Sequence, residues 1–378
     1  MVPNKMAKKL KVAIVCDWLT GIGGAERVVL ELHHLFPEAP IYTSQYDKNK
    51  IDWFDDADIR TTWLQLLPKS LKKFLPLLRA IAFSRLNLSQ YDLVISSSGA
   101  EAKAVHTSKT TLHINYCHSP THYYWIRKDE YFNNPGFPIG FNWLAKIGLK
   151  IMLEPLKQWD KRAAKKPDFM IANSTHTQNM IKKYYHRDSI VIHPPVDYNR
   201  FKLSINSTNV RHGLLIAGRQ SPYKKFDLAI KACNQLNIPL IVIGNGPDHK
   251  RLVKLANRNV TFLTNVNDNQ IVEHFQSSLG FILPNMDDFG IVAVEALSAG
   301  TPVIAYHKGG ALDYVKENQN GYFFKKQTVE SLIKAIEKLQ SRNFNYNKIS
   351  DNAKIYSTAN FKNSIKNYID DQINVFFK

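Results

Sequence analysis

The stretch LPNMDDFGIVAVEALSAGTPVIA, residues 283–305, predicts the end of a strand, an acidic loop, a helix and a second strand. The apolar run that closes at Leu283 is typical of a buried strand. The compact apolar segment Ile291–Leu297 predicts a helix packed in a core. Gly300 ends that helix, and the next strand follows from Thr301 to Tyr306.

The acidic residues of this stretch suggest a ligand. Asp287 and Asp288 stand where a helix N-cap belongs, and a cap is the simpler interpretation of such a pair. Gly290 lets backbone approach a ligand, and a helix N-terminus beside Phe289 and Gly290 offers free N–H groups to an anion. Glu295 lies inside the helix and needs a partner, because an unpaired buried carboxylate costs several kcal/mol. A ribose diol would supply one, so phosphate and sugar together predict a nucleotide-sugar.

Length, charge and cysteine content limit the number of domains, the class of partner and the compartment. A chain of 378 residues exceeds the usual size of one core, which favours two domains. The net charge of +18 implies an anionic partner: nucleic acid, an anionic membrane face or a phosphorylated substrate. Cys16, Cys117 and Cys233 have no zinc or disulfide spacing, so we expect a reducing, cytoplasmic compartment. We find neither a signal-peptide core nor an apolar run of ~20 residues, and expect no membrane-spanning segment.

The first half opens with a strand at Leu10–Asp17, a glycine-rich turn at Thr20–Glu26 and a helix at Arg27–Phe36. This order is that of a doubly wound α/β domain. The dinucleotide fingerprint fails because Glu26 stands at the third glycine position, so the turn either faces a phosphate or sugar or is a plain tight turn. Further strands are expected at Asp92–Ser97, Thr111–Cys117, Asp168–Asn173 and Ile190–Ile192.

His118 follows one of these strands directly, before Pro120. Loops beyond strand ends carry the active residues of such folds, although a single histidine is as often structural. Two basic, apolar stretches, Thr61–Leu88 and Gly140–Lys166, have helical spacing. Each predicts either a segment lying on a membrane surface or a domain helix with a solvated basic face.

The second half repeats the alternation of strands and helices, which predicts a parallel sheet. A polar run at Leu203–Arg211 is typical of a linker, and a tail at Asn360–Phe376 predicts an amphipathic helix. Strands are expected at Leu214–Ala217, Pro239–Ile243, Val260–Leu263, Leu279–Leu283 and Pro302–Ala305, with helices at Phe226–Gln235 and His249–Asn257. Arg219 and Lys224 taken alone are ordinary surface cations. Loops after parallel strands share one crevice, however, and this crevice would join Arg219 and Lys224 to Gly244, Asn265 and Gly290.

Taken together, the motifs resemble the retaining glycosyltransferases of family 4. The carrying stretches are GGAERV (from Gly23), NYCHSPTHYYW (Asn115), WDKRAAKKPDFMIANS (Trp159), PPVD (Pro194), GRQSPYKKFDLAI (Gly218), GNGPD (Gly244), DDFGIVAVEALSAGTPVIAY (Asp287), GGALDYV (Gly309) and FFKKQTVESL (Phe323). The resemblance implies an α/β chain with the GT-B fold, two facing Rossmann-like doubly wound domains. The expected parts are an acceptor-side domain at 1–200, a nucleotide-sugar domain at 201–357 and a helix at 358–378 that packs back on the first domain.

The same resemblance assigns roles to residues. Catalytic roles fall to His118, Asp287, Arg219 and Lys224, and the two cations would clamp the diphosphate. Donor binding would also involve Gly23, Gly24, Gly244, Asn265, Val266, Phe289, Gly290, Ile291, Val292 and Glu295. Three positions depart from the family pattern: Asp287 replaces a longer Glu, Asn245 a frequent Asp and Thr264 a frequent Gly. These departures bear on sugar choice and rate.

The closest resemblance is to bacterial mannosyltransferases of O-antigen and exopolysaccharide assembly, often assigned GDP-mannose. The expected reaction is therefore retaining, cofactor-free and metal-independent, because Arg219 and Lys224 take the place of a metal and no Asp-x-Asp follows a strand. The expected acceptor is a glycan or lipid-linked glycan. The expected location is cytoplasmic, peripheral on the inner face of the membrane.

Three alternatives stay open. They are a UDP-sugar-dependent transferase of the same fold, a nucleotide-sugar epimerase, and a basic protein that binds membrane or nucleic acid. A nucleic-acid partner is disfavoured, since we recognise neither a recognition helix nor an RNP-like strand in the sequence.

Overall fold

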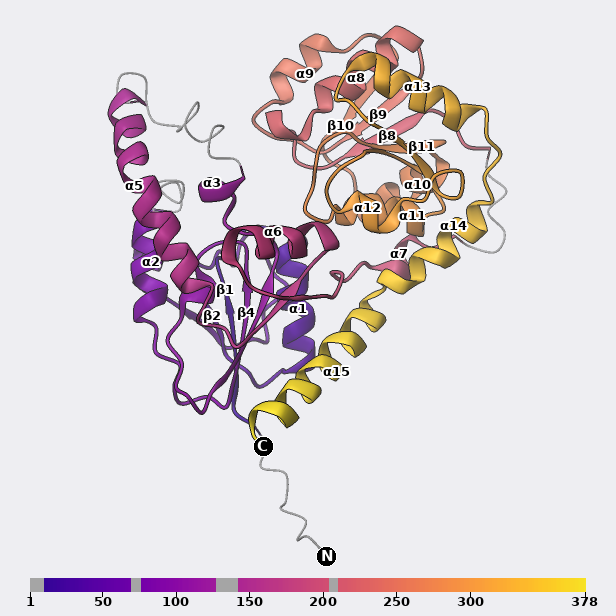
Figure 1. Ribbon diagram of the computed structural model, residues 1–378. Helices are drawn as coiled ribbons and strands as arrows, with labels where there is room; N and C mark the ends of the chain where they lie inside the picture. The colour runs from indigo at the N-terminus through magenta and orange to yellow at the C-terminus, as the bar shows by residue number, and fades with distance from the viewer. Residues whose placement is uncertain (1–9, 69–75, 127–141, 204–209) are drawn as a thin grey trace, which may run out of the picture. The chain divides into compact units, whose positions relative to one another are not determined.

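The computed structural model describes residues 10–68, 76–126, 142–203 and 210–378, with the backbone alone for 142–150. Contacts divide the chain into two compact units. One comprises Met1–His193 together with Lys362–Lys378, and the other comprises Pro194–Phe361 (Figure 1). Each unit has its own sheet and its own core, so each is described by itself.

The first unit contains a seven-stranded parallel sheet in the order β3-β2-β1-β4-β5-β6-β7. Its strands are β1 (Val12–Cys16), β2 (Ile41–Thr43), β3 (Ile59–Thr61), β4 (Leu93–Ser98), β5 (Leu112–Cys117), β6 (Phe169–Ala172) and β7 (Ile190–Val191). Its helices and 3-10 turns are α1 (Gly24–Leu35), η1 (Trp63–Leu66), α2 (Pro76–Arg85), η3 (Ala102–Ala104), α3 (His122–Trp125), α5 (Asn142–Ala163) and α6 (Thr175–Tyr185).

Strand β1 shows how this sheet is buried on both faces. Ala13 and Val15 point to one face and pack in a core with Phe83 of α2 and Ala163 of α5, while Ile14 is fully buried on the other face. Figure 1 shows α2 and α5 on one side of the sheet and α1 on the other. Burial on both faces explains why β1, with the sequence VAIVC, is a continuous apolar run rather than an alternating one.

The second unit contains a six-stranded parallel sheet in the order β10-β9-β8-β11-β12-β13. Its strands are β8 (Leu214–Ala217), β9 (Leu240–Ile243), β10 (Val260–Leu263), β11 (Gly280–Leu283), β12 (Val303–Tyr306) and β13 (Gly321–Phe324). Its helices and 3-10 turns are α7 (Tyr198–Phe201), η4 (Pro222–Lys224), α8 (Phe226–Leu236), α9 (His249–Leu255), α10 (Asp268–Ser277), α11 (Ile291–Ser298), α12 (Ala311–Tyr314), α13 (Val329–Gln340), α14 (Tyr346–Ala353) and η5 (Lys354–Tyr356).

Strand β11 separates two cores in this unit. Phe281 and Leu283 face a core built with α11 and α14, and Ile282 faces a second core built with α8 and α13. Figure 1 shows these helix groups on opposite sides of the sheet. The five strands predicted in this half are confirmed to within one residue at either end, and so are the two Rossmann-like parallel-sheet domains.

The chain leaves the second unit through α15 (Thr358–Phe376), whose residues from Lys362 onward are counted with the first unit. Within the first unit, the Lys362 Nζ lies 3.5 Å from the Glu31 Oε2 on α1. The predicted boundary after residue 200 differs from the division after His193. The reason is local packing: α7 belongs to the second unit because Phe201 packs against Phe275 of α10 at 5.3 Å between ring centroids.

Some predictions of local structure were wrong. Helix α1 begins at Gly24 rather than Arg27, so Glu26 lies in its first turn. Strands β2 and β3 were not predicted, because three residues are too few to show a periodicity of their own. Strand β13 was also missed, although it is as long as the other strands of its sheet. The linker prediction falls mainly on 204–209, outside the described residues.

The basic stretch Thr61–Leu88 is also not one amphipathic helix. Its described parts are the end of β3, η1 and α2, and residues 69–75 lie outside the described chain. Arg79 of α2 is buried and its Nε donates to the Glu101 Oε2 at 2.8 Å, so it is not part of a solvated basic face. Within the described ranges, no helix combines the length and the apolarity needed to cross a lipid bilayer.

Candidate functional site

The centre of the second sheet brings an ammonium group and a carboxylate together. Strands β8 and β11 are neighbours there, although the chain runs outward from β8 through β9 and β10 before it returns at β11. Loops after two such strands border a crevice at the carboxyl edge of the sheet. The Lys224 Nζ, after β8, lies 2.8 Å from Oδ1 and 2.6 Å from Oδ2 of Asp287, after β11. The fold therefore joins two predicted catalytic residues that the sequence separates widely.

Asn285 completes this cluster, and sequence reasoning missed it. Its Nδ2 donates to the Asp287 Oδ1 at 2.8 Å, so the carboxylate accepts hydrogen bonds from two side chains. Asn285 is buried and Asp287 is largely buried, with 14% of its side chain exposed. The only signal in the sequence was its position two residues before Asp287, directly beyond the predicted strand.

The loop ahead of α11 differs from its prediction. Gly290, rather than Asp287 or Asp288, is the N-cap residue of α11, with φ of 89° in the left-handed region. A Cβ there would lie 2.7 Å from the Tyr314 hydroxyl oxygen, so the position demands glycine in both conformation and space. Glycine supplies no capping oxygen, and this leaves the first-turn N–H groups of α11 to other acceptors.

Helix α11 presents backbone and one carboxylate, not apolar side chains, to a ligand. Phe289 is 3% exposed and packs in the core against Tyr314, at 5.4 Å between ring centroids. Ile291 and Val292 are half-buried against the same core. Glu295 lies in the second turn and is 6% exposed. The backbone groups of residues 289, 291 and 292 therefore lie at the start of this helix, and their part in donor binding stays a prediction.

Two glycine loops pack backbone against backbone at the same edge. Gly218 and Gly244, after β8 and β9, have φ of 136° and 111°. A Cβ on Gly244 would lie 2.3 Å from the Gly218 carbonyl oxygen, so no other residue fits there without moving the loop. The Gln220 Nε2 donates to the Gly244 carbonyl at 2.6 Å, and its Oε1 lies 2.7 Å from the His249 Nδ1. Gln220 and His249 thus hold the loops, and neither was singled out from the sequence.

The remaining predicted donor residues of this unit occupy the same edge. Arg219 is exposed, and its guanidinium pairs with no residue of the described chain. Asn265 is exposed after β10, while Val266 packs against the core below. The next residue, Asn267, caps α10 with its side chain. Arg219 is therefore a cation available to an anion, whereas Asn267 already has a structural task.

In the first unit the order of the strands along the sheet reverses between β1 and β4, and this is its topological switch point. The buried carboxylate of Asp17 lies there, directly after β1. The Asp17 Oδ2 accepts from the backbone N–H of Gly99 at 2.7 Å and of Ala100 at 2.9 Å. Its Oδ1 accepts from the N–H of Ala102 at 2.7 Å. Burial and, secondarily, the nearby Glu101 carboxylate raise the pKa of Asp17 to about 6. Sequence reasoning ended the first strand at Asp17 but gave it no role.

A test of this carboxylate follows from its raised pKa. In the unfolded chain Asp17 titrates near 3.8, so between that value and about 6 the folded state binds the extra proton. The contribution of Asp17 to the free energy of unfolding is then largest at low pH. It falls by up to about 3 kcal/mol as the pH rises through that window. Asp17→Asn has no such titration. We expect the difference in thermal midpoint, wild type minus variant, to shrink between pH 4 and pH 6 and to stay constant above pH 7. A difference that grows with pH would show instead that the three N–H donors lower the pKa.

His118 lies at the end of β5, at the carboxyl edge of the first sheet. Its Nε2 is 2.8 Å from the Ser97 Oγ, and its carbonyl accepts from the Asn173 Nδ2 at 2.9 Å. Its ring packs on Tyr116 at 5.2 Å between centroids. The Asn173 hydrogen bond fixes the backbone of His118, and the contacts with Ser97 and Tyr116 orient its ring. The side chain is half-buried and lies at an edge where ligands bind in such folds.

Gly23 and Gly24 lie in the loop after β1. Gly23 is the N-cap of α1 in an extended conformation, and Gly24 is the exposed first residue of that helix. A Cβ on Gly23 would meet only the end of the flexible Glu26 side chain, at 2.8 Å. Both glycines thus leave the start of α1 open at the edge that also carries His118.

No cluster of three or more His, Cys, Asp or Glu side chains suited to a metal ion occurs in the ranges the structure describes. Cys16, Cys117 and Cys233 are buried free thiols. Metal independence stays a prediction that needs a direct test.

Comparisons with known proteins agree with this geometry. The family described as Glycosyltransferase Family 4 matches residues 22–200, and the family described as Glycosyl transferases group 1 matches residues 199–356. An alpha-1,3/1,6-mannosyltransferase of Candida glabrata is 26% identical over 84% of this chain and 80% of its own length.

Two solved structures share the fold. Sucrose-phosphate synthase from Thermosynechococcus elongatus has a TM-score of 0.70 and 14% identity, over 97% of this chain and 100% of that one. The Anabaena protein HepE, in complex with UDP and glucose, has a TM-score of 0.68 and 17% identity, over 96% and 100%. With both family models matched in order across residues 22–356, the chain belongs to the GT-B glycosyltransferases of group 1 and family 4.

Proposed function

We propose that this glycosyltransferase moves mannose from GDP-mannose to a glycan or lipid-linked glycan, with retention of anomeric configuration and without metal or cofactor. The observation that carries the proposal is the Lys224–Asp287–Asn285 cluster at the switch point of the second sheet. A cation, a carboxylate and an amide meet at the crevice where open α/β sheets bind their ligands, and this supports a nucleotide-sugar as the ligand. The similarity to the Candida mannosyltransferase supports the choice of mannose.

The chemistry follows from where charge develops. Breaking the anomeric bond leaves a nucleoside diphosphate, and stabilising this leaving group is the largest single contribution the site can make. Lys224 and Arg219 supply positive charge, and the uncapped N-terminus of α11 supplies N–H donors. Glu295 would accept hydrogen bonds from the ribose hydroxyls, which gives this buried carboxylate its function.

Asp287 has a different part in this scheme. Two donors hold its carboxylate, so it is oriented rather than free to attack as a covalent nucleophile. We assign it to the hydroxyls of the donor sugar, and Asn285 fixes its orientation. Retention would then arise from attack of the acceptor on the face that the diphosphate leaves, with a phosphate oxygen accepting the acceptor proton.

A ligand screen tests the proposal. Thermal shifts are measured with GDP, GDP-mannose, UDP and UDP-glucose in EDTA, and the midpoint should rise with ligand as RT ln(1 + [L]/Kd). We expect GDP and GDP-mannose to stabilise the wild type, and Arg219→Ala to reduce the shift. Release of GDP from GDP-mannose in EDTA is the activity readout. Stabilisation that requires a divalent cation would contradict the metal-independent mechanism.

The second candidate donor is a UDP-sugar, and one observation favours it. The HepE structure, with the same fold, contains UDP and glucose. A thermal shift with UDP and UDP-glucose alone would replace mannose in the proposal and keep the Lys224 chemistry. Absence of a shift with every nucleotide, in folded protein, would overturn both candidates.

A further inference from the structure

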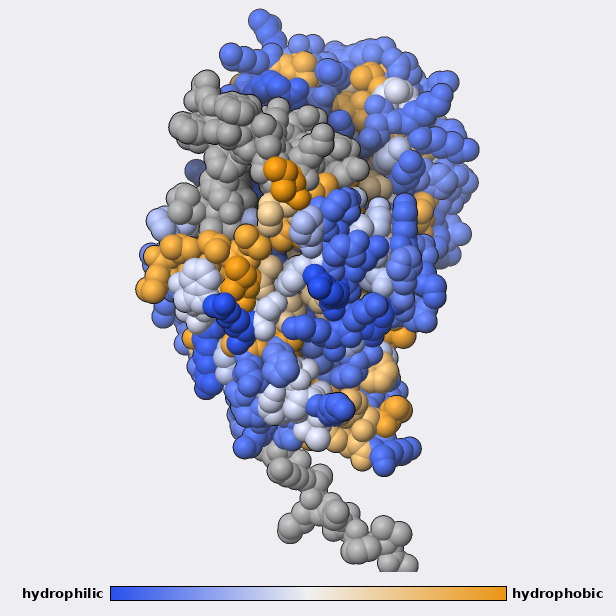
Figure 2. All heavy atoms as spheres, turned by 60° about the vertical axis from the view of Figure 1, so that its left-hand side comes forward, coloured by the Kyte–Doolittle hydropathy of each residue, from blue (hydrophilic) through white to orange (hydrophobic). Residues whose placement is uncertain are grey.

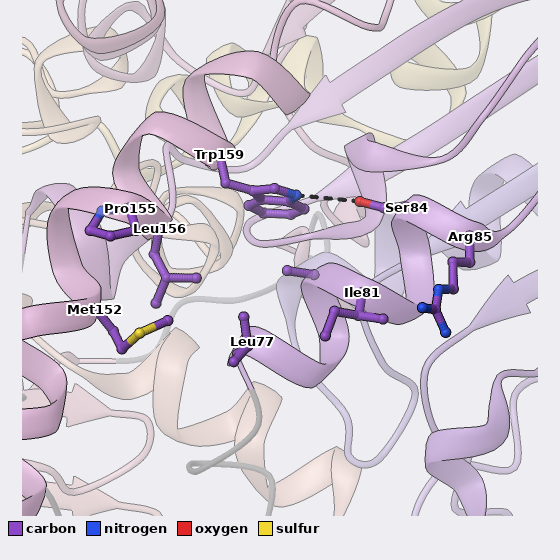
Figure 3. A pocket seen from close by; sticks show the side chains of 9 residues that line it. Leu77, Ile81, Ser84, Arg85, Met152, Pro155, Leu156 and Trp159 are labelled. Carbon is purple, nitrogen blue, oxygen red and sulfur yellow. Dashed lines mark hydrogen bonds between the residues drawn. The ribbon is translucent and has the colours of Figure 1, made fainter.

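Helices α2 and α5 of the first unit enclose an apolar groove of about 310 Å³ (Figure 3). It is lined by Leu77, Ile81 and Arg85 from α2 and by Met152, Leu156 and Trp159 from α5. The Trp159 Nε1 donates to the Ser84 Oγ at 3.3 Å, which ties the two helices together beside the groove. The volume is that of a small-molecule site rather than a packing defect.

The lining has an order along each helix. On α2, Leu77, Ile81 and Arg85 recur every four residues and so form one stripe, apolar at its start and cationic at its end. The stripe is about 12 Å long at 1.5 Å per residue. On α5, Met152 and Trp159 belong to a matching stripe. The groove is therefore elongated and apolar, with a guanidinium at one end.

Several large apolar side chains around the groove are exposed. Leu77 is 44% exposed, Ile151 on α5 is 68% exposed, and Leu66 on η1 is 87% exposed. Turn η1 packs on α2 through Leu64 and Ala82. Figure 2 turns this side of the molecule toward the viewer and shows hydrophobic atoms gathered there. Gathered exposed apolar side chains mark an interaction surface.

The charge at the groove selects the partner. The described part of α2, PLLRAIAFSR, contains no acid. Arg79 is neutralised by Glu101 in the core, but Arg85 is exposed, and its guanidinium has no hydrogen-bond or ion-pair partner in the described chain. An apolar slot that ends at an unpaired cation is complementary to a hydrocarbon chain with an anionic head group.

We propose that the α2–α5 groove binds one hydrocarbon chain of a phosphate-bearing membrane lipid, with the phosphate on Arg85. The exposed Leu77, Ile151 and Leu66 enter the lipid surface around it. This proposal deepens the proposed function, on which it rests for the need to reach a lipid-linked acceptor. It assigns the membrane contact to one groove and one cation instead of to a continuous basic helix.

Vesicle partitioning tests the groove. Full-length protein is mixed with phosphatidylcholine vesicles with or without phosphatidylglycerol and separated by flotation. We expect the wild type to bind only vesicles that contain the anionic lipid. Leu77→Asp and Arg85→Glu should each lower the partition coefficient by about tenfold or more. The matched controls are Ile355→Asp and Lys334→Glu, exposed positions of the second unit, which should float as the wild type does.

Fluorescence places the chain inside the groove. Trp63 of η1 is exposed and would also be quenched at the lipid surface, so the test uses a Trp63→Phe background. Brominated phosphatidylglycerol should quench the tryptophan emission of this variant, and adding Trp159→Phe should remove most of this quenching while the protein still floats. Unchanged flotation of Leu77→Asp and Arg85→Glu, or an equal loss in both controls, would overturn the proposal. In the Trp63→Phe background, quenching that is unchanged by Trp159→Phe would also overturn it.

The same samples separate this proposal from the proposed function. Nucleotide-induced thermal shifts without vesicles should be the same in Leu77→Asp, Arg85→Glu and wild type, which also shows that the variants fold. If no protein responds to nucleotide but the flotation pattern holds, the donor assignment fails and the groove stands. If nucleotide responses hold and flotation does not depend on the groove, only the lipid proposal fails.

Discussion

Replacing Lys224 by methionine is expected to lower kcat by about 100- to 1,000-fold, the usual effect of removing one preorganised charge from a developing anion. The ammonium is held by both oxygens of Asp287 and stands at the switch point of the second sheet. Methionine keeps the length of the side chain but cannot stabilise a leaving diphosphate. The measurement is steady-state release of nucleoside diphosphate, with the thermal midpoint as a check on folding. Lys231→Met, on the exposed side of α8, is the matched control and should keep full activity.

Asp287→Asn is expected to change the affinity for free nucleoside diphosphate in the direction opposite to Lys224→Met. The two variants together therefore test the arrangement. In the ligand-free protein the Asp287 carboxylate is the partner of the Lys224 ammonium. A diphosphate must share or take over that ammonium and is repelled by the carboxylate. We expect Asp287→Asn to bind free nucleoside diphosphate more tightly than wild type while its turnover falls. Weaker binding of the diphosphate by this variant would contradict the arrangement.

The largest expected loss of stability is at the Lys103–Asp160 pair of the first unit. The Lys103 Nζ lies 2.7 Å from the Asp160 Oδ1, and both side chains are almost fully buried. Asp160 also accepts from the Trp125 Nε1 at 2.7 Å and the Tyr185 hydroxyl at 2.8 Å. Burial alone would lower the pKa of Lys103, but the Asp160 carboxylate raises it above its ordinary value. Lys103→Met leaves that carboxylate uncompensated, at an expected cost of about 3–5 kcal/mol.

A double variant separates buried charge from lost packing. Lys103→Met/Asp160→Asn keeps an acceptor oxygen for the neighbouring donors and removes the unpaired charge. It should therefore unfold at a higher temperature than Lys103→Met alone. The exposed pair of Lys182 and Asp188, at 2.5 Å, is the control, and Lys182→Met should change the midpoint little because solvent screens such pairs. A double variant less stable than the single one would show that Asp160 matters through its hydrogen bonds alone.

The sequence by itself determined the architecture. Apolar runs of strand length alternate with helical segments, and this pattern depends only on residues near one another in the chain. It predicted five of the six strands of the second sheet and the helix that follows Gly290. It also placed Lys224, Asp287 and Glu295 near one edge, because the loops after parallel strands all lie at the carboxyl end of the sheet.

Only the tertiary structure decided which polar groups meet. Asp287 was expected to share in capping a helix, but its carboxylate pairs with Lys224, and Gly290 begins the helix. Arg79 belongs to the basic stretch Thr61–Leu88, for which a membrane-facing or a solvated surface was predicted, but Glu101 holds it in the core. Asp17 reaches across the first sheet to backbone N–H groups far along the chain. Periodicity indicates whether a position faces a core, but it carries no information on the partner of a polar group there. A buried charge needs a hydrogen-bond partner, and only the folding of distant segments brings that residue within reach.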